Sequence, residues 1–415
     1  TATARSPRWR DASPLHADAR IAVGKALRSR RAILAFISLL VGAGAQGAGP
    51  STAADLDRIV QEAIRPVMEK NGVPGMAVAV TVGGKRYFFS HGVAPRETGR
   101  KATEDTLFEI GTVSKTFTAT LGSYAGELGR LSLSDPAARH LPALAGSSVG
   151  GTTLLDLGTY AAGGLPLQFP DGVTDGESMT RYFRNWRPTH PAGTHRLYSN
   201  PSIGLFGHLA ARSMGTSFDA AMERKLFPMR GLARTYLHVP PERMDDYAWG
   251  TAKDGTRARV SPGVLDAETY GVKTTAADLV RFVEAHMDGA GLDAALRRAI
   301  TATHTGYHRV DAMTQGLGWE MYTWPVDLAR LLAGNSEDMA FKPHAVQRLA
   351  PPRAPRRDVL FNKTGSTNGF GAYVAFVPAR NIGVVLLANR NYPIPDRVKA
   401  AHRILQALDR LPARR

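Results

Sequence analysis

The tetrad Lys363-Thr364-Gly365-Ser366 places one cation, two hydroxyls and a glycine in four consecutive residues. It runs into an alternating apolar segment, residues 371–378, and is therefore predicted to lie along or just before a strand of a sheet. Glycine in a strand lets a ligand approach the backbone closely. Together these groups would form a wall for an anionic substrate that carries a carbonyl group. Lysine and threonine also occur on exposed strand edges for solubility, so the tetrad alone leaves a structural role open.

A second hydroxyl and ammonium, Thr112 and Lys115, fall on a predicted helix. Its apolar residues recur at four- and three-residue spacings and predict one buried stripe: Val113, Phe117, Leu121, Tyr124 and Leu128. Residues three apart share a helix face, so both polar groups face the same way at the first turn. A hydroxyl there lies near unpaired backbone N–H groups and the positive end of the helix dipole, where an oxyanion can be stabilised. Thr-x-x-Lys also occurs in many helices without a functional role.

Three predicted loops present further polar groups. Residues 159–168 form a loop interrupted by glycine and proline that ends in the amide of Gln168. Tyr198 and Asn200 lie two residues apart on a short loop before a helix, where a phenol and an amide can face one cleft or simply hydrogen-bond the loop. Residues 261–271, which include Tyr270, form a long loop without periodicity, the kind that lines functional sites.

Composition narrows the classes of function. The 415 residues contain no cysteine, which excludes disulfides, thiolate catalysis and cysteine-rich zinc sites. The histidines show no ligand spacing such as His-Glu-x-x-His, so no metal is expected. The net charge is +16, but the basic residues are scattered and do not alternate with aromatics, so a nucleic-acid partner is not expected. The charge suits solubility and anionic ligands, or reflects a basic bias of the source organism.

Residues 1–48 are predicted to be a leader. A positively charged segment, residues 1–31, precedes ten apolar residues, 32–41, and then a run of small residues that fits cleavage after Ala45 or Ala48. Ser29-Arg30-Arg31 resembles a twin-arginine export signal. The apolar run is too short to span a membrane. The sequence therefore predicts export to the periplasm without a stable membrane anchor, with a buried apolar helix as the alternative.

The predicted fold is α/β (α+β), with an antiparallel sheet flanked by N- and C-terminal helices. Apolar residues at helical spacing mark a helix at each end, residues 53–69 and 396–408, and Gly83-Gly84 predicts a two-residue hairpin. We expect residues 49–110 and 351–415 to form the α/β domain. Residues 111–350, mainly helical segments broken by glycine and proline, are expected to form an inserted α-rich domain.

The order of these motifs resembles that of the class C serine β-lactamases. The matching stretches are Phe108-Glu-Ile-Gly-Thr-Val-Ser-Lys-Thr-Phe117, Ala162-Gly-Gly-Leu-Pro-Leu-Gln168, Arg196-Leu-Tyr-Ser-Asn200, Leu265-Asp-Ala-Glu-Thr-Tyr-Gly-Val-Lys273, Gln315-Gly-Leu-Gly-Trp-Glu-Met321, Lys363-Thr-Gly-Ser-Thr-Asn-Gly-Phe370 and Leu387-Ala-Asn-Arg-Asn-Tyr-Pro393. The resemblance covers about residues 55–410. The Tyr-Ser-Asn element, and the absence of Ser-Asp-Asn, favour class C over class A.

One position departs from the family pattern Ser-x-x-Lys, because Thr112 occupies the place of the nucleophilic serine. Ser114 cannot replace it, since Phe117 and not a lysine follows three residues later. Threonine keeps a hydroxyl, but its extra methyl restricts χ1 and must fit a packed pocket. The resemblance therefore implies hydrolysis of β-lactam antibiotics, with cephalosporins favoured, through an acyl-enzyme on the hydroxyl of residue 112, slowed by the methyl.

The resemblance also implies the roles of individual residues. The implied catalytic residues are Thr112, Lys115, Tyr198, Lys363 and Ser366, with the backbone N–H groups of the first and last as the oxyanion hole. The implied substrate-binding residues are Gln168, Asn200, Tyr270, Thr364, Gly365, Asn391 and Arg397. Neither metal nor cofactor is implied, the partner is a small β-lactam, and a monomer is expected. A D,D-peptidase or esterase of the same fold, or a variant that binds β-lactams without hydrolysis, are the alternatives.

Overall fold

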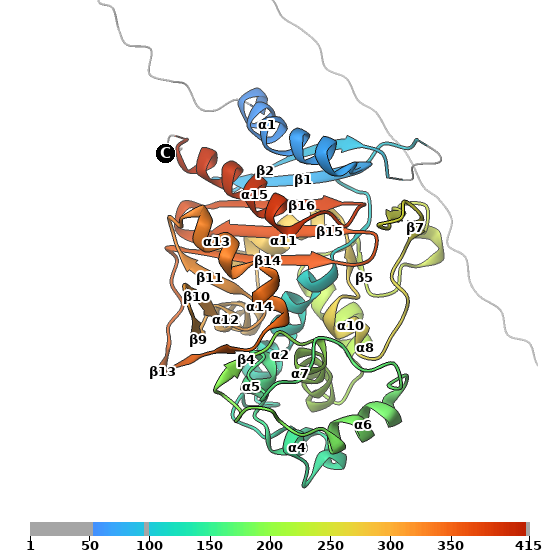
Figure 1. Cartoon of the computed structure of the whole chain (residues 1–415). Coiled ribbons are helices and arrows are strands. Elements are labelled where there is room, and N and C mark those ends of the chain that lie inside the picture. The colour runs from blue at the N-terminus through green and yellow to red at the C-terminus, as the bar shows by residue number, and fades with distance from the viewer. Residues whose placement is uncertain (1–52, 95–98, 412–415) are drawn as a thin grey trace, which may run out of the picture. The chain divides into compact units, whose positions relative to one another are not determined.

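The computed structural model describes residues 53–94 and 99–411, all of which belong to one compact unit that runs from Ala48 to Arg415. The predicted leader, residues 1–48, lies outside the described residues. Figure 1 shows a large sheet with helices on both of its faces and a further group of helices beyond one edge of the fold. Among the described residues, no helix is both long enough and apolar enough to cross a membrane.

The sheet has nine strands in the order β13-β9-β10-β11-β14-β15-β16-β1-β2, and each neighbouring pair is antiparallel. Its strands are β1 (Gly75–Val82), β2 (Lys85–Gly92), β9 (Gly306–Val310), β10 (Met313–Gln315), β11 (Glu320–Thr323), β13 (Gln347–Arg353), β14 (Val359–Ser366), β15 (Gly371–Val377) and β16 (Ile382–Ala388). Gly83 and Gly84 join β1 to β2 with φ of +57° and +77°, which confirms the predicted hairpin.

One face of the sheet is covered by the first and last helices, as predicted. Helix α1 (Ala53–Asn71) packs beside α15 (Ile394–Asp409), and α13 (Leu328–Gly334) lies next to α15 (Figure 1). Apolar side chains of these helices, such as Leu56 and Ile404, are buried with Val80 and Leu386 of the sheet. The terminal helices and the antiparallel sheet between them confirm the predicted fold class.

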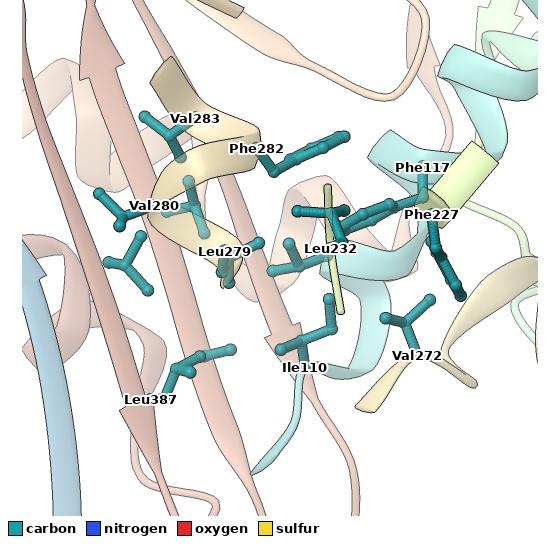
Figure 2. Packing of buried hydrophobic residues seen from close by; sticks show 14 of the residues in the cluster. Ile110, Phe117, Phe227, Leu232, Val272, Leu279, Val280, Phe282, Val283 and Leu387 are labelled. Atoms are coloured by element: carbon teal, nitrogen blue, oxygen red, sulfur yellow. The ribbon is translucent and has the colours of Figure 1, made fainter. Parts of the chain in front are cut away.

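The opposite face of the sheet holds the helix that begins two residues after the predicted nucleophile, Thr112. Helices α11 (Ala276–Met287), α12 (Ala294–Thr303) and α2 (Ser114–Glu127) share one hydrophobic core with strands β14, β15 and β16. Phe117 of α2 stacks on Phe282 of α11 with ring centroids 3.9 Å apart (Figure 2). This aromatic contact fixes α2 against the sheet.

Helix α2 is more deeply buried than its sequence predicts. The apolar spacing predicted one buried stripe, but every residue from Ser114 to Ala125 is buried, because α7 (Asn200–Ser213), α10 (Asp266–Thr269) and α12 surround the helix. Leu128 was predicted to be buried and is 38% exposed, because it caps the helix after Glu127. Four threonine and serine residues inside this helix pair with backbone carbonyls or amides and so remain compatible with burial.

Helices α3 (Ala137–His140), α4 (Ser148–Gly151), α5 (Leu154–Gly158), α6 (Gly176–Asn185) and α7 form a layer with its own core, built from residues such as Leu157, Phe183 and Phe206. The other elements are α8 (Phe218–Ala221), α9 (Phe227–Met229), α14 (Glu337–Phe341), β3 (Phe108–Glu109), β4 (His195–Arg196), β5 (Thr235–Tyr236), β6 (Gly250–Thr251), β7 (Arg257–Ala258), β8 (Lys273–Thr274) and β12 (His344–Ala345).

The predicted boundary of the inserted domain at residue 350 is wrong. Strands β9, β10 and β11 lie within residues 111–350 but belong to the main sheet, and β11 pairs directly with β14. Helix α11, also within that range, packs on β1 and β16. The three strands are only three to five residues long, too short for an alternating pattern to stand out from the helical segments before them.

Two histidines in the core are expected to make the folded protein less stable in mild acid. His286 and His304 are fully buried, their nitrogens Nδ1 and Nε2 are 3.1 Å apart, and burial lowers the pKa of His304 to about 3 and that of His286 well below its usual value. As the pH falls, these two histidines therefore bind protons in the unfolded chain before they do so in the folded protein, which favours unfolding. Stability is complete above the unfolded pKa of about 6.5 and falls as the pH drops below it.

We expect the free energy of unfolding to fall by roughly 2 kcal/mol per histidine between about pH 7 and about pH 5. Urea titrations at both pH values measure it. The double variant His286→Phe/His304→Phe replaces both hydrogen-bond partners together and should lose about 2–4 kcal/mol less over the same interval. The same loss in the double variant and the parent would contradict this explanation.

Candidate active site

Two glycines bring the start of helix α2 against strand β14. The chain enters α2 through a short 3₁₀ turn, Gly111–Val113, and Gly111 has a φ of +51°. A Cβ atom on Gly111 would lie 2.4 Å from Ser366 N, and a Cβ atom on Gly365 would lie 1.9 Å from Ile110 O. The turn and the strand can approach this closely only because both residues lack a side chain.

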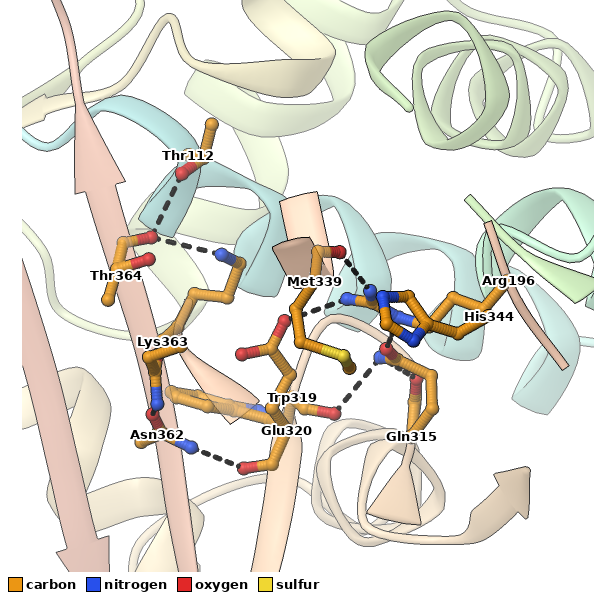
Figure 3. A network of polar contacts seen from close by, with 12 residues as sticks. Thr112, Arg196, Gln315, Trp319, Glu320, Met339, His344, Asn362, Lys363 and Thr364 are labelled. Atoms are coloured by element: carbon orange, nitrogen blue, oxygen red, sulfur yellow. Dashed lines mark hydrogen bonds and ion pairs between the residues drawn. The ribbon is translucent and has the colours of Figure 1, made fainter. Parts of the chain in front are cut away.

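This approach places the hydroxyl of Thr112 beside the predicted tetrad. Thr112 Oγ1 donates a hydrogen bond of 2.9 Å to the backbone oxygen of Thr364 (Figure 3). The same oxygen accepts a bond of 3.0 Å from Lys363 Nζ. Segments that are 252 residues apart in the sequence therefore meet in one site.

The structure shows a packing role for Gly365 that the sequence did not predict. The sequence suggested that this glycine admits a ligand, but the group that approaches it is the backbone of Ile110. The missing side chain of Gly365 therefore makes room for the turn that carries Thr112.

We expect Gly365→Ala to destabilise the fold by about 1–3 kcal/mol, because the added methyl forces the turn away from β14. Thermal unfolding measures the change. Gly172→Ala is the matched control, since a Cβ atom there meets nothing within 4 Å and its φ is not in the left-handed region. A Tm for Gly365→Ala equal to that of the control would contradict the proposed packing role.

Two lysines flank the phenol of Tyr198. Lys115 Nζ and Lys363 Nζ each lie 5.0 Å from the centroid of the Tyr198 ring. Lys115 is fully buried and donates to Asn200 Oδ1 at 2.6 Å and to Thr269 O at 3.2 Å. The phenol oxygen is buried, and no atom in the described part of the chain makes a hydrogen bond of good geometry with it.

The surroundings shift the pKa values of this cluster toward neutrality. Burial, reinforced by the neighbouring Lys363, lowers the pKa of Lys115 to about 8 against the opposing effect of Tyr198. Burial raises the pKa of Tyr198, but the two ammonium groups outweigh burial and lower it to about 8. A phenol and an ammonium with matched pKa values can exchange a proton at little cost, which suits general acid–base catalysis.

A cavity of about 170 Å³ opens onto this cluster. Five of the predicted site residues line it, namely Thr112, Tyr198, Lys363, Thr364 and Ser366. Lys115 and Asn200 lie beneath the cavity, where they contact each other. The structure therefore brings together the hydroxyl, the phenol and the two ammonium groups that the sequence suggested.

Arg397 does not face this cavity, contrary to prediction. Its side chain is fully buried, and its nitrogens donate to Gly365 O at 2.6 Å, Ser366 Oγ at 3.0 Å and Asn391 Oδ1 at 2.7 Å, as well as to the backbone of Tyr392. Burial lowers its pKa to about 10, so the guanidinium stays charged at neutral pH. Its geometry fits a residue that positions the end of β14, not one that binds substrate directly.

The other predicted substrate-binding residues lie around the site without lining the cavity. Gln168 is exposed on a loop whose preceding residue, Leu167, does line it. Asn391 is exposed and accepts from Arg397, while Tyr270 is partly buried at the end of α10. Gln168 and Asn391 therefore both lie within three residues of a side chain that lines the cavity, Leu167 for the first and Ile394 for the second.

Sequence reasoning missed a buried ion pair in the cavity wall. Arg196 Nη2 lies 3.0 Å from Glu320 Oε1, and both side chains are almost fully buried (Figure 3). Arg196 also donates to Gln315 Oε1 at 2.8 Å, and its guanidinium carbon lies 5.5 Å from the centroid of the Tyr198 ring. Arg196 lies in the Arg196–Asn200 motif and Glu320 in the Gln315–Met321 motif, but these are 124 residues apart in the sequence, which does not indicate that they pair.

Comparisons with known proteins agree with this geometry. The family model described as Beta-lactamase matches residues 60–409. A β-lactamase of Pseudomonas fluorescens is 54% identical over 357 residues, which are 86% of this chain and 100% of that protein. The chain belongs to the class C β-lactamases.

Solved structures place the fold in the same family. A crystal structure of a class C β-lactamase in complex with cefoxitin has a TM-score of 0.83 and 45% identity, and covers 86% of this chain and 99% of its own. A β-lactamase/D-alanine carboxypeptidase from Pseudomonas syringae has a TM-score of 0.83 and 46% identity, with 85% and 98% covered. The predicted class C family and its hydrolysis of β-lactams are thereby confirmed.

Proposed function

We propose that this class C enzyme hydrolyses cephalosporins through an acyl-enzyme on the Thr112 hydroxyl, at a rate limited by the threonine methyl. The observation that carries the proposal is the convergence of that hydroxyl, the Tyr198 phenol and the Lys363 ammonium on one cavity, with Lys115 beneath it. Each group is of the type that acyl transfer needs, namely a nucleophile, a base and cations near developing charge.

Acylation would begin with attack by Thr112 Oγ1 on the lactam carbonyl carbon. The hydroxyl proton passes to the Tyr198–Lys115 pair and then to the lactam nitrogen as the carbon–nitrogen bond breaks. Backbone N–H groups of Thr112 and Ser366, which the close approach at Gly111 brings together, would stabilise the oxyanion. Water activated by Tyr198 then cleaves the ester and restores the hydroxyl.

The present hydrogen bond of the threonine hydroxyl opposes the first step. Thr112 Oγ1 donates its proton to the backbone oxygen of Thr364, which cannot act as a base. A β-branched residue has few χ1 rotamers, so the methyl limits the positions from which the hydroxyl can pass its proton to Tyr198. The threonine is thus expected to slow acylation while leaving the fold intact.

Recognition of an anionic substrate has support in the local charge. Lys363 lines the cavity, and Arg397 lies behind Ser366 without a carboxylate partner among the described residues. A substrate carboxylate would therefore enter a positive potential in a site of low dielectric constant. We assign its direct binding to Lys363 and Thr364, with Asn391 and Arg397 acting through Ser366.

A D,D-peptidase activity is the second candidate, since one similar structure carries the name β-lactamase/D-alanine carboxypeptidase. Rates with nitrocefin, a D-alanyl-D-alanine peptide and a p-nitrophenyl ester compare the alternatives directly. A nitrocefin rate that exceeds both others supports the cephalosporin proposal. A faster reaction with the peptide or the ester would favour the corresponding alternative.

Intact-mass spectrometry tests the covalent step. After exposure to a cephalosporin, we expect an adduct that peptide mapping assigns to Thr112. An adduct that persists indicates acylation without turnover, and no adduct at any time would contradict the acyl-enzyme.

We also propose that the mature enzyme is a periplasmic monomer exported by residues 1–48. Sedimentation would measure its oligomeric state, and cell fractionation its location.

A further inference from the structure

Arg230 carries a buried charge that the catalytic site does not use. It follows helix α9 and is 7% exposed. Its Nη2 donates to Phe282 O at 3.1 Å, whereas Nε and Nη1 have no hydrogen-bond acceptor in the part of the chain that the structure describes. Burial lowers its pKa to about 9, so the guanidinium is still protonated at neutral pH.

A cavity of about 280 Å³ adjoins this side chain. Arg86 of β2, Arg281 and Glu284 of α11, and Asp288 line it together with Arg230. It also contacts Gly84 and Asn381, the turns at one end of β1 and β16, whereas the catalytic tetrad pairs with β15 toward the opposite end of these strands. The cavity is therefore separate from the active site.

The two carboxylates of this cavity are already occupied. Glu284 accepts from Arg86 Nε at 2.7 Å and from Thr81 Oγ1 at 2.8 Å. Asp288 Oδ1 accepts from Ala290 N at 2.9 Å. Neither is paired with Arg230. Arg86 is paired with Glu284, and Arg281 lies 4.0 Å from Asp278. Among the described residues, Arg230 has no carboxylate partner, so the uncompensated positive charge and the unsatisfied donors belong to the most buried arginine of the cavity.

Unsatisfied buried donors are costly, and a charged donor more so. An anion with several acceptor oxygens would satisfy both free nitrogens of Arg230, because the planar guanidinium matches an oxyanion in a bidentate geometry. The volume is at the small end for ligand sites and suits a compact group. We propose that this cavity binds an oxyanion of the phosphate type, with Arg230 as its principal ligand and Arg281 at its rim.

Calorimetric titration with inorganic phosphate, at ionic strength matched with potassium chloride, tests the proposal. We expect one site in the parent protein and at least about tenfold weaker binding in Arg230→Gln, since a charge-assisted bidentate contact is lost. Arg309→Gln is the control, because it removes the same charge from an exposed residue of β9 outside this cavity, and should bind as the parent does.

Nitrocefin hydrolysis separates this cavity from the catalytic one. Phosphate that binds at the distal cavity leaves the KM for nitrocefin unchanged at saturating concentration. Competitive inhibition, together with binding retained in Arg230→Gln, would assign phosphate to the active site and overturn the proposal. Equal phosphate affinity of the parent and Arg230→Gln would also overturn the proposal. So would the absence of phosphate binding, which leaves water as the partner of the Arg230 nitrogens.

A second variant keeps the test valid if Arg230→Gln does not fold. Arg281→Gln changes a side chain that is 46% exposed and is expected to fold. We expect about threefold weaker phosphate binding, because this rim residue contributes one partly screened contact. An Arg281→Gln protein that binds phosphate as tightly as the parent would contradict the assignment.

Discussion

Thr112→Ser is expected to raise the turnover of cephalosporins at least about tenfold. Removing the methyl frees χ1, so the hydroxyl can leave the Thr364 carbonyl and turn toward the Tyr198 phenol. Misplacing a reacting atom by about 1 Å can cost roughly 10²-fold in rate, and one methyl is enough to cause such a displacement. Steady-state kinetics with nitrocefin measure the effect on kcat and KM.

Thr116→Ser provides the matched control for this substitution. Thr116 lies four residues further on, in α2, is buried, and donates its hydroxyl proton to Val113 O at 2.8 Å. It therefore loses the same methyl at a position that does not line the cavity. We expect no gain in turnover there. Equal rates for Thr112→Ser and the parent would refute the view that the methyl is the obstacle.

Lys115→Ala is expected to remove the remaining activity, with a loss of roughly 10²–10⁴-fold. The ammonium is one of the two charges that lower the pKa of Tyr198, so its removal takes away both a proton carrier and the group that tunes the base. The measurement is best made in the Thr112→Ser background, where the rate to be lost is larger.

Stability distinguishes a chemical role of Lys115 from a structural one. Burial of an ammonium without a carboxylate partner is unfavourable, so Lys115→Met should keep or raise the Tm while losing the same activity as the alanine variant. A folded Lys115→Met protein with near-parental turnover would show that the proton passes by another route. A large loss of Tm in Lys115→Met would identify the lysine as a structural residue.

The sequence predicted those parts of the fold that depend on local patterns. The hairpin at Gly83-Gly84 follows from turn chemistry, and helices α1 and α15 follow from apolar spacing. Strands β9, β10 and β11 were missed, because their assignment depends on pairing with β14 and with each other, which a short segment does not encode by itself.

The candidate site was predictable in its residue types but not in its contacts. The motif order identified Thr112, Tyr198 and Lys363, which the structure brings to one cavity. The motifs could not reveal that Gly365 makes room for the backbone of Ile110, or that Arg397 donates its hydrogen bonds to Gly365 O and Ser366 Oγ. Both contacts depend on which groups are packed together in the folded protein, and the spacing of residues along the sequence does not reveal this.

The position of Arg397 has a consequence for biosynthesis. The proposed catalytic residues all precede residue 367, yet the guanidinium that holds Gly365 O and Ser366 Oγ comes from the last helix, α15. A ribosome that stops before α15 releases a polypeptide with every reacting group and without the clamp on β14. The position of the reacting groups therefore depends on a helix that follows all of them in the chain, so a polypeptide that stops before Ile394 should be inert.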